Sequence, residues 1–164
     1  MKKRTITLIF LMLISFAWKS FAQNTLEKTR EYFEKYKTEK QIMEFCNNSF
    51  PTIEDCKVVF KENDAKTFFE YSENTKKKMK DQVGSEKTKL INLKIETFNS
   101  NEINKQKEAL ELKGIQDKIQ SDITFYTFCY QIENDSYFKS CFNFWVYIED
   151  RWVFFSHPKL AFEN

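Results

Sequence analysis

The sequence predicts an α+β domain in which N-terminal helices pack on a curved antiparallel sheet of about four strands. Three observations lead to this fold class. Residues 122–157 are rich in aromatic and β-branched side chains and contain no Gly or Pro, which is typical of packed strands. Residues 87–98 alternate apolar and polar side chains, as a half-buried strand does. Residues 24–80 space their apolar side chains at helical intervals.

The C-terminal run divides into three strands at two polar clusters, residues 134–136 and residues 149–150. We expect an antiparallel meander joined by tight turns. A three-residue turn at 134–136 places Cys129 directly opposite Cys141. Opposed residues of an antiparallel pair lie at the short end of disulfide reach. The register therefore predicts a Cys129–Cys141 bridge, with two buried free thiols as the alternative.

This register sorts the meander onto two faces. The better core face carries Tyr126, Phe128, Tyr130, Ile132, Phe138, Phe142, Phe144, Val146, Ile148, Val153 and Phe155. The other face carries Phe125, Cys129, Cys141, Asn143, Trp145, Tyr147, Trp152 and Phe154. This second face is either covered by another part of the chain or used for binding. If it is exposed, its aromatic side chains form a patch large enough for an interface. The candidate binding residues are Phe125, Trp145, Tyr147, Trp152 and Phe154.

Residues 1–22 have the pattern of a secretory signal peptide. A basic start precedes an apolar stretch from Ile6 to Ala17, and small residues at Ser20 and Ala22 predict cleavage before Gln23. The apolar stretch is short for a membrane span. Cleavage removes four basic residues and no acidic one, so the formal charge falls from +2 to −2. We therefore expect one exported domain at residues 23–164, periplasmic or extracellular, with no membrane association after cleavage and no charge favouring nucleic acid.

All four cysteines lie in the predicted mature chain, at Cys46, Cys56, Cys129 and Cys141. An even number of cysteines in an exported protein indicates disulfides. Three pairings are possible, and Cys46–Cys56 with Cys129–Cys141 is favoured because both bridges close short loops. A zinc site would need paired C-x2-C spacing, which the sequence lacks. No metal and no cofactor is expected.

Three helices are expected before the first strand. The first spans Asn24 to about Asn47, with Thr38 as its candidate break point. A capping-box pattern at residues 52–55 opens a short second helix that runs through Val59. The third is capped by Asn63 or Asp64 and ends near Lys80.

The strand at residues 87–98 is expected near a sheet edge. Its charged side chains discourage pairing with other chains. Ile91, Leu93 and Ile95 should point to one side, and Asn92, Lys94 and Glu96 to the other. A polar helix from Glu102 to Lys113, stopped by Gly114, is expected next, with a mobile insertion as the alternative.

Candidate catalytic groups are few, and no catalytic residue is assigned. The chain has no G-x-S-x-G, H-E-x-x-H or C-x-x-C motif, and its two glycines leave no phosphate loop. His157 is most simply a strand-end residue. Asp55, Glu62 and Asp64 cluster, but Asp55 and Asp64 are better explained as helix-start residues. Tyr126 and Tyr130 could offer a phenol to a pocket, although core positions suit them as well. Lys76, Lys77, Lys78 and Lys80 form either an anion patch or a solvated helix end.

The order of helices, strand, helix and three-strand meander resembles that of nuclear transport factor 2-like and cystatin-like domains. The chain looks like a small secreted protein of Bacteroidota with unknown function. The resemblance rests on Phe21-Ala22-Gln23, on the helix containing Asp55-Cys56, and on residues 145–155. It implies a bent sheet wrapped around helices, often with a conical pocket. Such folds host enzymes and binding modules alike.

The expected function is a secreted, non-enzymatic binding or protein-interaction module, of which an inhibitor or immunity protein is one version. Its expected partner is a protein or a small apolar ligand, with a homodimer through the sheet as a further possibility. The alternative is a small pocket enzyme of the isomerase or dehydratase type. A closed apolar pocket that holds a Tyr and a carboxylate would favour that alternative.

Overall fold

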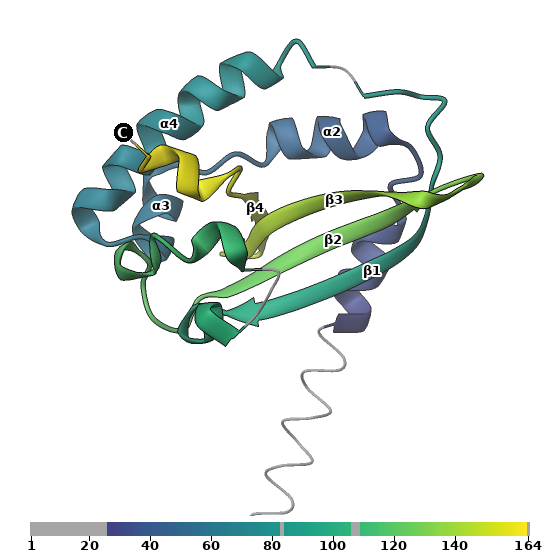
Figure 1. Ribbon diagram of the computed structural model, residues 1–164. Helices are drawn as coiled ribbons and strands as arrows, with labels where there is room; N and C mark the ends of the chain where they lie inside the picture. The colour runs from purple at the N-terminus through teal and green to yellow at the C-terminus, as the bar shows by residue number, and fades with distance from the viewer. Residues whose placement is uncertain (1–25, 83, 106–108, 164) are drawn as a thin grey trace, which may run out of the picture. The chain divides into compact units, whose positions relative to one another are not determined.

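The computed structural model describes residues 26–82, 84–105 and 109–163 (Figure 1). The predicted signal peptide at residues 1–22 lies outside these ranges. The chain divides into two compact units, residues 1–35 and residues 36–164. The first unit contributes one described helix, residues 26–34, in which Arg30 and Glu34 form an ion pair of 3.7 Å.

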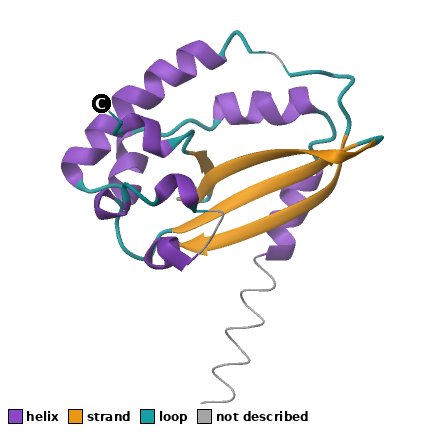
Figure 2. Ribbon diagram, viewed as in Figure 1, coloured by secondary structure: helices purple, strands orange, loops and turns teal. Residues whose placement is uncertain are grey.

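The second unit is an α+β structure, which confirms the predicted fold class. Three helices precede an open, four-stranded antiparallel sheet with the order β1-β2-β3-β4 (Figure 2). The helices are α2 (Glu39–Asn48), α3 (Ile53–Val59) and α4 (Glu62–Met79). The strands are β1 (Leu90–Asn99), β2 (Thr124–Ile132), β3 (Asp135–Ile148) and β4 (Arg151–Phe154).

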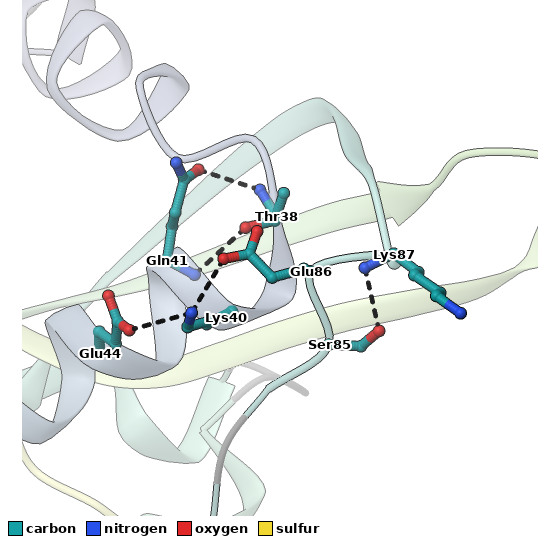
Figure 3. Close-up of polar contacts among 7 residues, drawn as sticks. All are labelled: Thr38, Lys40, Gln41, Glu44, Ser85, Glu86 and Lys87. Atoms are coloured by element: carbon teal, nitrogen blue, oxygen red, sulfur yellow. Dashed lines mark hydrogen bonds and ion pairs between the residues drawn. The ribbon is translucent and has the colours of Figure 1, made fainter.

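The predicted first helix is interrupted at its candidate break point, Thr38. Thr38 has an extended backbone and accepts a hydrogen bond from the Gln41 amide, while the Gln41 side chain accepts one from the Thr38 amide. This reciprocal capping box starts α2 (Figure 3). Lys40 of α2 also reaches Glu86 at 3.0 Å, which ties the helix to the segment before β1. The hydrogen bond and charge of Glu86 raise the pKa of Lys40.

The second and third helices follow the sequence prediction closely. Thr52 and Asp55 form the predicted capping box of α3, which ends at Val59. The helix α4 begins at Glu62, with Lys61 in place of Asn63 or Asp64 as its N-cap residue, and ends at Met79. Its buried positions, Ala65, Phe68 and Ser72, recur at spacings of three and four, so a single face meets the core.

Each of the two hairpins of the meander contains predicted residue pairs. Cys129 pairs with Cys141. The last hairpin pairs Trp145 with Phe154 and Tyr147 with Trp152. Its two turn residues, at 149 and 150, both have positive φ, as a tight two-residue hairpin turn requires.

The first turn of the meander differs from the prediction. Ile132 pairs with Asp135, so the turn has two residues, and Asn134 adopts a positive φ of 66°. The register then shifts between Gln131 and Ile132, and this irregularity restores the opposition of the two cysteines. The predicted cysteine register is therefore confirmed, although the predicted three-residue turn is wrong.

A β-bulge in the middle of β3 overturns the predicted faces. Phe142 pairs with Phe128, whereas Trp145 pairs with Tyr126, so two β3 residues oppose Thr127 alone. One extra residue moves every later side chain of β3 to the opposite face. The expected grouping of Tyr126 and Phe128 with Phe144 is therefore wrong.

The core lies on the face of the sheet that α3 and α4 cover. Phe155 contacts Phe60, which follows α3, and Phe68 of α4, with ring centroids 6.0 and 5.5 Å apart. The strands contribute Phe98, Phe125, Phe144, Val146, Ile148 and Val153 to this core, and Phe155 follows β4.

Two further expectations need correction. A bulge between Ile91 and Lys94, with Asn92 at φ 50°, breaks the alternation of β1, so Leu90 and Leu93 are buried and Ile91 is exposed. The predicted helix at 102–113 is instead a pair of short 3₁₀ helices, Ser100–Lys105 and Leu110–Leu112, on either side of residues outside the described ranges. Too few apolar residues recur at helical spacing there to support an α-helix. The expected edge position of β1 is confirmed.

Candidate functional site: a cleft beside strand β3

A cleft of about 490 Å³ lies between the C-terminal half of α4, the middle of β3 and the segment that follows β4. Its size falls within the range of roughly 300–1,000 Å³ found for small-molecule sites. The lining residues are Tyr71, Thr75, Lys78, Met79, Gln82, Cys141, Phe142, Asn143, Phe144, Phe154, Ser156, His157 and Leu160.

The cleft exists because β4 is much shorter than β3. β4 pairs only with residues 145–148 of β3, so no described strand continues along the first part of β3 on that side. After β4 the chain turns away at His157, which has a left-handed φ of 44°, into the 3₁₀ helix η4 (Pro158–Ala161). This segment lies beside α4 (Figure 1) and contributes one wall of the cleft.

The bulge of β3 lies in the wall of the cleft. Phe144 has a φ of 63°, a conformation that is an outlier for a bulky side chain. Its carbonyl accepts a hydrogen bond of 3.0 Å from the Phe155 amide, which holds the bulge against the chain leaving β4. Bulges often re-aim side chains beside functional sites. Here the bulge places Asn143, half-buried, on the cleft.

The cleft is lined by basic rather than acidic side chains. Lys78 and His157 line it, and none of the described lining residues is Asp or Glu. The Nδ1 atom of His157 lies 3.5 Å from Glu111, and the imidazole is 62% exposed, so His157 is a surface residue at the rim. The uncharged polar lining residues are Tyr71, Thr75, Gln82, Asn143 and Ser156.

The predicted Cys129–Cys141 disulfide is present and forms part of the cleft. It joins neighbouring strands across 12 residues of sequence, with Cα atoms 4.0 Å apart. That short separation is typical of a pair whose main chains do not hydrogen-bond to each other. The main-chain N–H and C=O of Cys141 therefore point away from β2, toward the side where the cleft lies. Cys141 is exposed, whereas Cys129 is 8% exposed.

The favoured Cys46–Cys56 bridge is absent. Both residues are free thiols and fully buried. Burial raises the pKa of both thiols, that of Cys56 to about 12 with a further contribution from the Asp55 charge. Cys46 lies on the buried side of α2 with Ile42, and Cys56 faces the core from α3. They thus act as small apolar core residues.

The five predicted binding residues do not form one open patch. Phe125 and Trp145 are fully buried, and Trp152 and Phe154 are each 7% exposed, leaving Tyr147 at 51%. Phe125 lies on the core face, stacked 5.3 Å from Phe98, because the bulge brings Phe144 and the later core residues of β3 to its side of the sheet.

The other four residues keep a common face, which helix α2 helps to cover. Phe45 of α2 stacks on Trp145 with ring centroids 5.1 Å apart. Phe50 contacts Phe154 at 5.9 Å. The covered arrangement that the sequence left open is the one observed. Of the five predicted residues, only Phe154 lines the cleft.

The other candidate catalytic side chains do not lie together in one site. Asp55 is bound within its capping box and forms an ion pair with Arg151. Asp64 lies 3.3 Å from Lys118. Tyr126 contacts Trp152 with ring centroids 4.9 Å apart, and burial raises the pKa of its phenol. Only His157, of the single residues considered for catalysis, lines the cleft. No cluster of three metal-ligating side chains occurs among the described residues.

Several cleft residues were missed by the sequence analysis. Tyr71 and Thr75 lie one turn apart on α4 and carry no motif. Lys78 was considered only as part of a lysine-rich helix end. The sequence feature that could have indicated the cleft is the difference in length between the last two strands. A short final strand leaves part of the edge of the neighbouring strand open.

No helix in the described part of the chain is long and apolar enough to cross a membrane. Comparisons with protein-family models, with curated proteins and with solved structures find no match to this chain.

Proposed function

We propose that this chain is an exported, non-catalytic binding module, of the nuclear transport factor 2-like or cystatin-like kind, whose ligand occupies the cleft beside β3. The cleft itself supports the proposal, because its volume suits a small ligand and several polar groups lie on its apolar walls. The cross-strand disulfide fits an exported protein.

The distribution of reactive groups favours binding over catalysis. A pocket enzyme of the isomerase type would pair a Tyr with a carboxylate in a closed apolar site. The cleft offers Tyr71, but its described lining contains no carboxylate. Asp55 is held in a separate ion pair with Arg151. Proton transfer by a positioned acid and base therefore has less support than simple binding.

A fragment screen by NMR tests this function on the mature chain with its disulfide intact. Bound fragments are expected to shift the amide resonances of Thr75, Asn143 and Ser156 and to remain chemically unchanged. Thr75→Trp should abolish binding by filling the cleft. Thr67→Trp is the matched control, because Thr67 is exposed on the same helix and does not line the cleft. Conversion of a fragment to product, dependent on Tyr71 or His157, would instead support an enzyme.

A further inference from the structure

We infer that the cleft selects a small organic anion: a carboxylate or similar head group attached to an apolar body. This inference rests on the proposed binding function and names the ligand class. Its first support is the charge of the lining. Lys78 brings an ammonium group to the cleft and His157 lies at its rim beside Glu111, while the described lining itself contains no Asp or Glu. An ammonium donates well to a carboxylate, and such charge-assisted bonds are stronger than neutral ones.

The helix that carries Lys78 strengthens this preference. Lys76 and Lys77 precede it in the last turn of α4, and Lys80 follows. The summed positive charge raises the local concentration of anions around the cleft. For these lysines the sequence left an anion patch and a solvated helix end as alternatives; of the group, Lys78 lines the cleft and Lys77 does not.

Uncharged polar groups add directional contacts for the same head group. Asn143 and Thr75 present an amide and a hydroxyl, which can donate to a carboxylate oxygen. The outward-facing N–H of Cys141 belongs to the open edge of β3 and offers a further donor on the cleft side.

The apolar body of the ligand has its own surface. Met79, Phe142, Phe154 and Leu160 line the cleft from four different elements. Leu160 is 52% exposed, so a ligand would remove an exposed apolar side chain from water. The combination of apolar walls with a few basic and polar groups suits an amphipathic anion better than a fully hydrated one such as phosphate.

Three probes with the same apolar chain and different head groups test this inference: octanoate, octan-1-ol and octylammonium. NMR titration of the mature chain should show octanoate binding at the cleft at least tenfold more tightly than octylammonium, with octan-1-ol between them. Lys78→Met should weaken octanoate binding by about tenfold and leave octan-1-ol binding unchanged. His157→Asn, which tolerates the left-handed backbone, should weaken octanoate binding by a smaller factor.

Lys77→Met is the matched control. Both side chains are exposed, and the change removes the same charge from the same turn, but Lys77 does not line the cleft, so octanoate affinity should change less than twofold. Equal binding of the three probes at the cleft would overturn the anion preference and leave the binding function standing. Tighter binding of octylammonium would overturn it as well. If none of the probes shifts the cleft resonances, the ligand class is wrong, and the fragment screen decides separately whether the cleft binds anything.

Discussion

At the scale of single residues, Gly84 shows how one missing side chain allows two segments to meet. A Cβ atom on Gly84 would lie 2.8 Å from the main-chain carbonyl group of Glu39 and from the amide nitrogen of Lys40. These are backbone atoms at the start of α2, which cannot rotate away as a side-chain tip could. Glycine is needed here for close approach rather than for an unusual φ, because neither glycine has a positive φ.

Gly84→Ala should therefore destabilise the fold. Overpacking against fixed atoms typically costs about 1–3 kcal/mol, and we expect the free energy of unfolding in urea to fall by that amount. Gly114→Ala is the matched control, since its nearest atom is the flexible end of Lys159 at 3.9 Å. That change should leave stability unchanged or raise it by up to about 1 kcal/mol. Equal effects of the two substitutions would contradict the proposed close approach.

At the scale of elements, one ion pair joins α3 to the last hairpin. Asp55 is buried, accepts hydrogen bonds from the Thr52 amide and hydroxyl at 2.6 and 2.7 Å, and pairs with Arg151 at the start of β4. The same carboxylate thus begins a helix and fixes that helix against the sheet. Only the first of these roles is visible in the local sequence, because Arg151 is far from Asp55 along the chain.

A double-mutant cycle with Asp55→Ala and Arg151→Ala should separate the two roles. Asp55→Ala alone should lower the free energy of unfolding by about 1–3 kcal/mol, because it removes both the helix cap and the ion pair. The coupling energy with Arg151→Ala should be about 1 kcal/mol or more, as expected for contacting groups. The exposed pair Glu54 and Lys57 on the same helix provides a control, with coupling near 0.2–0.5 kcal/mol. Comparable coupling in both cycles would show that Arg151 contributes nothing specific.

At the scale of the whole second unit, the core keeps two thiols away from water. Cys46 and Cys56 are both fully buried, and the folded state raises the pKa of each above the ordinary value of 9.0. An unfolded chain releases these protons at lower pH than the folded chain does. The resulting stabilisation is complete below pH 9 and is lost as the pH rises toward the folded value of about 12 for Cys56.

Stability should therefore decline in mildly alkaline solution. Above pH 9 each buried thiol should lower the free energy of unfolding by up to about 1.4 kcal/mol per pH unit. Urea unfolding at pH 8, 9 and 10 measures this slope, with peptide mapping to verify that only Cys129–Cys141 is bridged. The double variant with Cys46→Ala and Cys56→Ala should be less stable at pH 8 but show a much smaller slope. An unchanged slope in that variant would assign the pH dependence to other groups.

Local chemistry explains most of the successful predictions. The capping box of α3 depends on residues three positions apart, and the last hairpin depends on a two-residue turn. The predicted Cys129–Cys141 pairing is confirmed, although the turn between the two strands has two residues and not the predicted three. The register shift between Gln131 and Ile132 places the two cysteines opposite each other again. The 3₁₀ segments were missed because propensity alone does not separate short helices of different kinds.

The sequence by itself determined the α+β fold class, the start of α3, the meander and the bridged cysteine pair, because each depends on neighbours in the chain or on two adjacent strands. The tertiary structure alone decided the two faces of the sheet, the free state of Cys46 and Cys56, and the cleft. The physical reason is the bulge before Trp145. A single extra residue reverses a strand's faces, and the bulge packs against residues outside its own strand, such as Phe45, which lies far away in the sequence, and Phe155, which follows the last hairpin.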